Sequence, residues 1–327
     1  LPQWWSQLRR VPVPSLSLLQ TSKPPWTLGL SRNWPRIARR FILPIAGTPK
    51  TLERAALDLK ELGKTGIMVP EIGLGTWKYR GGVEPLEAGI GQGAWLIDTA
   101  EMYRTEDVVG RAIASRRKEV FLATKVSGSH LRRDQVLRAA DASLRLLDTD
   151  YIDLYQIHWF NRGVPIAETM GAMESLVEQG LVKYVGVSNF NLEELQEAQN
   201  AMSRNPIVSN QVLYSLIDRE IEGRLLPYCQ EQDITILAYT PLADGSLAGK
   251  SRFPGRNSSG IKALEAVAAE AGKTLAQVAL NWCTSHPNVI AIPKSDRVDR
   301  TLENCGASGW RLSSNQVKTL DAAFSTR

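Results

Sequence analysis

Short apolar runs alternate with amphipathic stretches along most of this chain. Because the runs are continuously apolar rather than alternating, they indicate parallel strands that are covered on both faces. The runs are residues 72–75, 95–98, 120–125, 152–158, 183–188, 207–212, 234–239 and 289–293. Eight such runs predict eight parallel strands.

The stretches between the runs have the period of helices. In one of them, Val136, Ala140, Leu144 and Leu147 recur at spacings of three and four, which is typical of one buried helical face. The clearest helical stretches are residues 106–117, 133–147, 167–180, 191–202 and 260–283. Strand followed by helix, repeated eight times, predicts an α/β fold that closes as a (β/α)₈ TIM barrel.

The alternative α/β fold is a doubly wound open sheet. That fold favours a GxGxxG turn between its first strand and first helix, whereas this chain has GLGTWKYRGG over residues 73–82. The barrel is therefore the better interpretation.

Both ends of the barrel have distinctive features. Two short strands around Gly-Lys-Thr-Gly at residues 63–66 predict a β-hairpin cap ahead of the barrel.

The first helix, within residues 83–94, can make about two turns at best. Its three glycines weaken it, so that this unit is either loose or lacks residues. A single helix over 313–324 ends the chain without a long loop, which predicts an open mouth and broad substrate choice.

The first residues of the chain differ from the rest. Residues 1–50 contain eight basic and no acidic residues, whereas the remainder has 31 basic and 34 acidic ones. The leader is either a transit-type targeting segment or no part of the mature protein. We expect residues 1–58 to be a basic, disordered or non-native extension, and residues 59–327 to be the barrel domain.

Composition excludes several classes of partner. The net acidic remainder gives no reason to expect nucleic-acid binding. No run of 18 apolar residues predicts a membrane span. Three widely separated cysteines argue against disulfides and zinc and favour a reducing compartment. We expect a cytoplasmic monomer, or an organellar one if the leader is a transit segment.

Polar or aromatic residues end nearly every predicted strand. In αβ barrels the active site lies at the carboxyl ends of the strands. These residues are Trp77, Asp98, Lys125, His158, Ser188, Asn189, Gln211, Tyr239, Lys294 and Ser295. Such a ring predicts a site at the mouth of the barrel.

The order of the motifs carries a family resemblance over residues 59–324. The motifs are GLGTW (73–77), LIDTAEMY (96–103), ATK (123–125), IHW (157–159), VGVSNF (185–190), SNQ (209–211), AYTPL (238–242) and IPKSxxxxRxxEN (292–304). Together they resemble the aldo-keto reductase superfamily, in its bacterial-type members with a short carboxyl terminus. The resemblance implies an oxidoreductase that reduces aldehydes or ketones, dicarbonyls among them, to alcohols with NADPH.

The family's catalytic tetrad corresponds here to Asp98, Tyr103, Lys125 and His158. Tyr103 would be the general acid, and its phenol has an ordinary pKa near 10. Lys125 would lower that pKa, and Asp98 would keep Lys125 charged and oriented. His158 would orient the carbonyl oxygen. Taken singly, each residue also fits a structural role. Asp98 could cap a helix and Lys125 could be a solvated loop residue, whereas His158 and Tyr103 could pack in the core.

The resemblance also implies a cofactor site. Ser188, Asn189 and Gln211 would bind the nicotinamide carboxamide, and Tyr239 would stack on the ring. Lys294, Ser295 and Arg300 would hold the 2′-phosphate of NADP, and Glu303 and Asn304 the adenine. The full expected set is Gly75, Thr76, Trp77, Ser188, Asn189, Gln211, Tyr239, Thr240, Leu242, Lys294, Ser295, Arg300, Glu303 and Asn304. As alternatives, Ser188 and Asn189 could form a turn after a strand, and Tyr239 could be a core aromatic residue. The cluster at Lys294 could be a solvated helix start.

Trp77, His158 and Trp159 are the expected substrate contacts, although a tryptophan is as often plain packing. A barrel glycosidase would need two carboxylates at strand ends. A metal-dependent hydrolase would need several histidine and carboxylate ligands, whereas the chain has three histidines and Lys125 would repel a cation. We therefore expect no metal. A nucleotide-binding regulatory subunit or a structural barrel with little turnover is the alternative to an enzyme.

Overall fold

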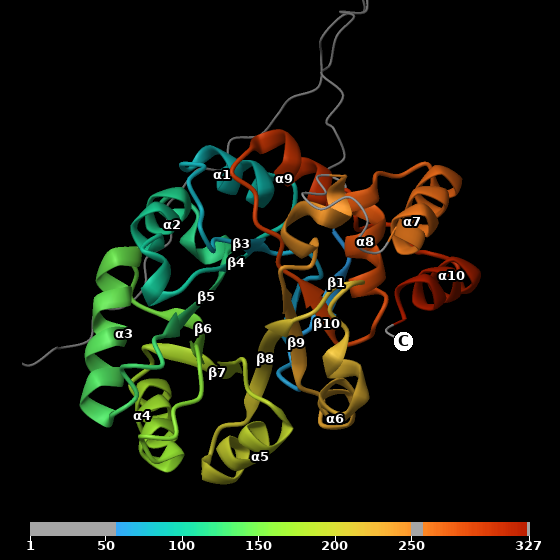
Figure 1. The fold of residues 1–327 in the computed structure, drawn as a ribbon. Helices are drawn as coiled ribbons and strands as arrows, with labels where there is room; N and C mark the ends of the chain where they lie inside the picture. The colour runs from blue at the N-terminus through green and yellow to red at the C-terminus, as the bar shows by residue number, and fades with distance from the viewer. Residues whose placement is uncertain (1–56, 250–257, 326–327) are drawn as a thin grey trace, which may run out of the picture. The chain divides into compact units, whose positions relative to one another are not determined.

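Eight parallel strands form a barrel in the computed structural model, which describes residues 57–249 and 258–325 (Figure 1). The strands are β3 (Leu74–Gly75), β4 (Leu96–Asp98), β5 (Phe121–Val126), β6 (Ile152–Ile157), β7 (Val182–Ser188), β8 (Ile207–Leu213), β9 (Thr235–Tyr239) and β10 (Val289–Ala291). All eight lie where the apolar runs predict them. Of the predicted extension over residues 1–58, residues 1–56 fall outside the described residues, whereas Leu57 is buried in the core.

The sheet closes on itself. Each strand pairs in parallel with the next one along the chain, from β3 to β10. Parallel bridges then join Ile72 to Ala291 and Gly75 to Lys294. The Gly73 amide donates to the Ala291 carbonyl at 2.8 Å. The predicted (β/α)₈ barrel is confirmed.

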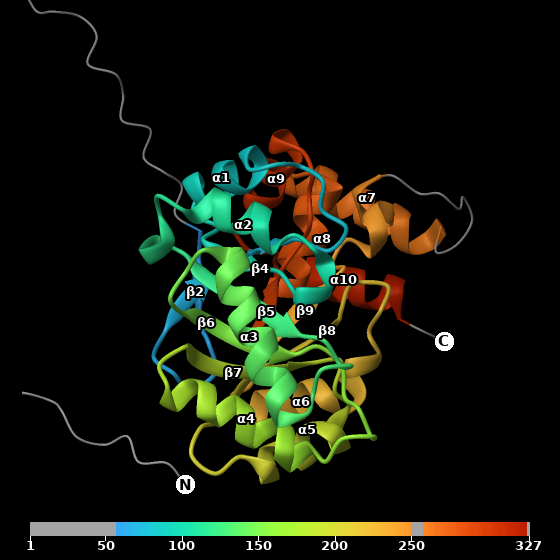
Figure 2. The same ribbon diagram turned by 90° about the vertical axis from the view of Figure 1, so that its left-hand side faces the viewer.

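Helices surround the strands on the outside (Figures 1 and 2). They are α1 (Glu84–Gly91), α2 (Glu106–Ile113), α3 (Arg133–Leu147), α4 (Ile166–Glu178), α5 (Leu192–Ala201), α6 (Leu225–Glu231), α7 (Ser258–Ala271), α8 (Leu275–Thr284), α9 (Val298–Cys305) and α10 (Ser314–Phe324). Short 3-10 helices η1 (Glu101–Tyr103), η2 (Arg117–Glu119), η3 (Glu220–Gly223) and η4 (Ala243–Ala248) lie in the loops.

The prediction of one helical stretch over 260–283 is wrong, because two helices occupy it. Gly272 ends α7 with a φ of +62°, a conformation that suits glycine. Thr274 then caps α8, with its hydroxyl accepting from the Gln277 amide in a capping box. The glycine and the capping box end one helix and begin the next, although the helical spacing of apolar residues continues across them.

The first barrel helix is short and well packed. Helix α1 has eight residues, in line with the expected two turns. Its side chains Leu86 and Ile90 are buried, and a Cβ on Gly89 would lie 2.7 Å from a methyl group of Leu74. The glycine that weakens the helix therefore lets it approach the sheet closely, and the expectation of a loose unit is not met.

The expected hairpin closes the amino-terminal end of the barrel. Strands β1 (Leu59–Glu61) and β2 (Met68–Pro70) pair antiparallel, and Leu62 and Val69 belong to the apolar cluster that fills the barrel interior. The Lys60 ammonium donates to the backbone carbonyls of Thr284, His286 and Val289 at 2.6, 2.6 and 2.8 Å. The hairpin is thereby tied to the end of α8 and to β10.

Alternation along the strands builds the polar layer at the opposite end. Side chains two apart on a strand point to the same face. Leu96 and Ala123 belong to the interior apolar cluster, so that Asp98 and Lys125, two residues further on, also point inward. The strands thus change from an apolar interior to charged side chains at their carboxyl ends.

We predict that Gly110→Ala lowers the free energy of unfolding by about 1–3 kcal/mol, the usual cost of overpacking. A Cβ on Gly110 would lie 2.8 Å from the Leu147 carbonyl oxygen and 2.9 Å from that of Leu146. This clash opposes the better helix propensity of alanine, about 1 kcal/mol. Urea denaturation measures the change.

Gly91→Ala is the matched control. It lies in α1, and no described atom is within 4 Å of the added Cβ, so that the free energy of unfolding should stay constant or rise. Equal effects of the two substitutions would contradict the packing of α2 on α3.

Candidate active site

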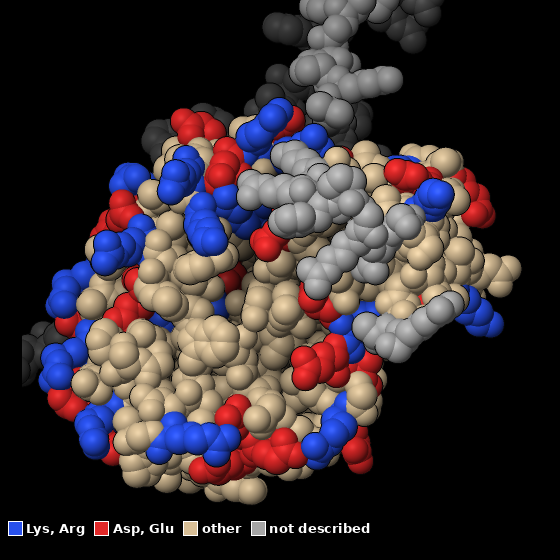
Figure 3. All heavy atoms as spheres, in the orientation of Figure 1, with Lys and Arg blue, Asp and Glu red and all other residues tan. Residues whose placement is uncertain are grey.

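A cavity of about 700 Å³ opens at the carboxyl ends of the strands. Figure 3 shows a hollow near the middle of this face, bordered largely by uncharged side chains. Every residue of the expected cofactor set lines the cavity, as do Asp98, Tyr103, His158 and Trp159. Lys125 is not part of the lining and lies fully buried.

Other lining residues were not expected. They are Lys78, Met102, Pro241, Asp244, Gly245, Ala248, Ala276, Ile292, Pro293, Asp296 and Arg297. Most come from loops, where the residue type gives no periodic signal. Asp296 and Arg297 lie within the IPKSxxxxRxxEN motif, at positions for which that pattern specifies no residue.

A buried ion pair lies below the cavity floor. The Lys125 ammonium is 2.8 Å from Asp98 Oδ2 and donates to the Thr99 carbonyl at 2.7 Å. Burial alone would lower the pKa of Lys125, but the Asp98 carboxylate raises it above its ordinary value. Lys125 is therefore a permanent cation at neutral pH.

Two amide side chains complete the environment of Asp98. Gln211 Nε2 donates to Asp98 Oδ1 at 2.7 Å, and Gln156 Nε2 lies 3.4 Å from the same atom. A buried carboxylate needs such partners to offset its lost hydration. Gln156 was not among the expected site residues, although it also points inward two residues after Leu154.

Three buried threonine hydroxyls hold the loop that carries Tyr103. Thr105 Oγ1 lies 3.1 Å from Thr76 Oγ1 and 2.9 Å from Thr99 Oγ1. Thr76 Oγ1 donates to the Asp98 carbonyl at 3.0 Å. These hydrogen bonds join the ends of β3 and β4 to the start of α2, so that η1 between them is fixed.

The Tyr103 hydroxyl lies between two tetrad members. Its Oη is 3.4 Å from Lys125 Nζ and 3.4 Å from His158 Nε2, and its ring centroid is 4.9 Å from that of Trp77. The structure therefore brings all four tetrad residues together, as the sequence motifs predict.

Lys125 lowers the pKa of Tyr103 as expected, but burial acts in the opposite direction. Burial raises the pKa of Tyr103 above its ordinary value and outweighs the lowering by Lys125. Tyr103 is consequently a neutral phenol at neutral pH, with a proton to donate. The nearby cation stabilises the phenolate that donation leaves behind.

His158 is a neutral imidazole. Burial and the nearby Lys125 cation lower its pKa to about 3. Its Nδ1 is buried without a hydrogen-bond partner, and its Nε2 faces Tyr103. With the proton on Nε2, the ring can donate a hydrogen bond into the cavity next to the Tyr103 hydroxyl.

The expected nicotinamide contacts form one hydrogen-bonded group. Ser188 Oγ donates to the Gln211 carbonyl at 2.9 Å, and Tyr239 Oη donates to Asn189 Oδ1 at 2.9 Å. Asn189 Nδ2 donates to the His158 carbonyl at 3.1 Å. Because Gln211 gives its amide donor to Asp98, its Oε1 is left as an acceptor for a carboxamide. These residues fit a nicotinamide.

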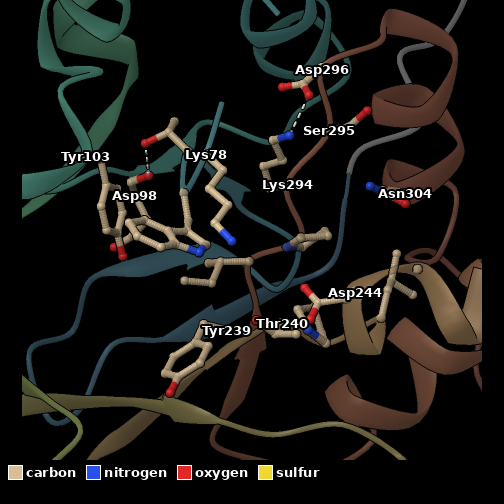
Figure 4. Close-up of a pocket in the computed structure, with 18 of the residues that line it drawn as sticks. Lys78, Asp98, Tyr103, Tyr239, Thr240, Asp244, Lys294, Ser295, Asp296 and Asn304 are labelled. Atoms are coloured by element: carbon tan, nitrogen blue, oxygen red, sulfur yellow. Dashed lines mark hydrogen bonds and ion pairs between the residues drawn. The ribbon is translucent and has the colours of Figure 1, made fainter. Parts of the chain in front are cut away.

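The other end of the cavity contains charged residues (Figure 4). The Lys294 ammonium lies 2.5 Å from Asp296 Oδ2, and Arg300 pairs with Glu303. Arg300 Nε is buried without a partner, and Asn304 is buried in the cavity wall. The expected phosphate and adenine contacts therefore lie together, about the start of α9.

The described residues contain neither a metal-binding cluster nor a helix that could span a membrane. Among them no three His, Cys, Asp or Glu side chains are arranged to hold a metal ion. No helix within the same residues is both long and apolar enough to cross a membrane.

Comparison with known proteins agrees with this fold and site. The model of the aldo/keto reductase family matches residues 71–324. A methylglyoxal reductase of Escherichia coli is 38% identical over 272 residues, which are 79% of this chain and 92% of that protein. A glyoxal reductase of Bacillus subtilis is 33% identical over 263 residues, covering 79% of this chain and 90% of its own length.

Solved structures are similar as well. The thermostable aldo-keto reductase Tm1743, in complex with the inhibitor epalrestat, has a TM-score of 0.76 and 41% identity, covering 82% of this chain and 100% of its own. An aldo/keto reductase of Klebsiella pneumoniae, in complex with NADP and acetate, has a TM-score of 0.73 and 37% identity, covering 81% and 95%. This chain belongs to the aldo/keto reductase family.

We predict that the His158 imidazole does not titrate between pH 5 and 8, since its pKa is lowered to about 3. ¹⁵N-detected NMR of the histidine rings measures this, with His158→Gln to assign the signals. A titration midpoint near the ordinary value of 6.5 would contradict the burial and the effect of Lys125.

Proposed function

We propose that this chain reduces aldehydes and ketones to alcohols with a nicotinamide cofactor. The observation that carries the proposal is the position of the Tyr103 hydroxyl, within 3.4 Å of both the Lys125 ammonium and His158 Nε2. A proton donor, a fixed cation and a neutral hydrogen-bond donor converge there on one point of the cavity.

A reduced nicotinamide, held by the residues described above, would supply a hydride for the carbonyl carbon. As negative charge develops on the carbonyl oxygen, Tyr103 Oη donates its proton to that oxygen, which completes the alcohol. Lys125 stabilises the resulting phenolate, and Asp98 holds Lys125 in place. Water then returns a proton to Tyr103. In oxidation the same group acts as the base, since the steps reverse.

His158 orients the substrate in this proposal. A neutral imidazole can donate from Nε2 to the carbonyl oxygen without competing for the proton that Tyr103 delivers. Trp77 and Trp159 are 47% and 50% exposed and provide apolar walls for the rest of the molecule. Small aldehydes and dicarbonyls are the proposed substrates, because methylglyoxal and glyoxal reductases are among the relatives.

We propose NADPH as the cofactor. The nicotinamide end would be held by Ser188, Asn189 and Gln211 beneath Tyr239, and the adenosine end by Lys294, Arg300 and Asn304. Related structures contain NADP and NADPH. The cytoplasmic location and the monomeric state stay predictions.

We predict that Tyr103→Phe lowers kcat for carbonyl reduction by about 10²–10⁴-fold, the usual contribution of a general acid. The substitution removes the proton and keeps the ring packed against Trp77, so that the cofactor Kd should stay within about twofold. Steady-state kinetics with methylglyoxal and small aldehydes, together with fluorescence titration of NADPH, measure both quantities.

Tyr184→Phe is the control, since Tyr184 lies in β7 against Phe121 and outside the cavity lining. Full activity of Tyr103→Phe would refute the assigned acid. If the wild-type protein binds NADPH and reduces nothing, the regulatory or structural barrel replaces the enzyme.

A further inference from the structure

We infer that Asp296 relaxes the cofactor selectivity of this chain, so that NADH binds nearly as well as NADPH. This inference rests on the proposed nicotinamide site and concerns its adenosine end. It follows from how the charges in that end of the cavity are paired.

Both cations expected near a 2′-phosphate, Lys294 and Arg300, already have a carboxylate partner, and so does the neighbouring Arg297. The three pairs are Lys294 with Asp296, Arg297 with Asp299, and Arg300 with Glu303. Among the described residues, these three pairs form a cluster with no net formal charge. A 2′-phosphate at neutral pH has a charge of about −1.5 to −2, and a balanced cluster offers it little net attraction.

Asp296 is held at the cavity wall from two sides. Its Oδ2 is 2.5 Å from the Lys294 ammonium, and its Oδ1 accepts from the Arg80 backbone amide at 2.8 Å. The loop after β3 lies directly on it, since a Cβ on Gly81 would be 2.8 Å from the Asp296 carbonyl oxygen. Figure 4 shows the Lys294–Asp296 pair at the edge of the cavity. The carboxylate is thus a fixed part of the site.

The two cofactors meet this carboxylate differently. A 2′-phosphate must take the ammonium from Asp296 and then lie beside that carboxylate, and like charges so close together destabilise binding. A ribose 2′-hydroxyl is neutral and can donate a hydrogen bond to the carboxylate, as it does to the acidic residue of NAD-binding folds. Asp296 therefore disfavours NADPH and favours NADH.

NADPH binding is weakened rather than prevented. Arg300 Nε is buried and has no hydrogen-bond partner among the described residues, so that it remains available to a phosphate oxygen. The Asp296 side chain is 38% exposed, so that water and salt screen its repulsion. Removal of one partly exposed charge should change the affinity by about two- to fivefold.

Isothermal titration calorimetry on the full chain tests this without turnover. The ligands are NADPH and NADH, together with 2′,5′-ADP and 5′-AMP, which differ only by the 2′-phosphate. For the wild type we expect the Kd values of NADPH and NADH to differ by less than about tenfold. For Asp296→Asn we expect 2′,5′-ADP to bind about two- to fivefold tighter and NADH to bind no better than before.

Two further variants separate the effect of the Asp296 charge from the loss of its hydrogen bond and from a change in net charge. Asp296→Ser keeps a group that can accept from the Arg80 amide and should shift selectivity in the same direction. Asp107→Asn removes one exposed carboxylate from α2, away from the cavity lining, and should leave all four Kd values unchanged. An equal change in Asp107→Asn would reduce the effect to net charge and overturn the inference.

The failure of this inference is distinct from that of the proposed function. A wild type that binds NADPH more than about tenfold tighter than NADH, or an Asp296→Asn variant with unchanged selectivity, would overturn the role of Asp296 alone. Binding of neither nucleotide would overturn both. Loss of reduction with intact nucleotide affinities would overturn the reductase and leave this inference standing.

Discussion

The Lys125–Asp98 ion pair is the constraint around which the site is arranged. Both side chains are almost completely buried, and buried charges are tolerated only where partners replace the lost water. Here those partners are the Thr99 carbonyl, the Gln211 and Gln156 amides and the Tyr103 hydroxyl. Satisfying the pair therefore fixes the very groups that a carbonyl reductase needs.

The same pair explains the protonation states around it. The positive charge of Lys125 helps to lower the pKa of His158, which keeps that imidazole neutral. It also opposes the rise in the pKa of Tyr103 that burial causes. One fixed cation thus leaves a phenol that can donate its proton and a histidine that cannot compete for it.

The sequence predicts the barrel because its signals are periodic. Each apolar run that indicates a strand occupies a strand, and the face formed by Val136, Ala140, Leu144 and Leu147 is buried. The break at Gly272 depends on local helix caps, and the close approach of Gly89 depends on a neighbouring strand. Helical periodicity therefore predicts neither. The gathering of the expected tetrad and cofactor residues at one cavity could be predicted because they follow strand ends within known motifs. The pairing of the charged side chains could not be predicted, because a motif specifies residue types and not the partners of each residue.

The measurement that tests the account most directly is kcat/KM of the double variant Asp98→Asn with Lys125→Met. Removing both charges leaves no unpaired ion in the core, so that the fold should persist with a free energy of unfolding close to that of the wild type. The account predicts a loss of at least about 100-fold in kcat/KM, because the phenolate of Tyr103 loses its cation. A folded double variant that keeps kcat/KM within about tenfold of wild type would contradict the central role of the pair.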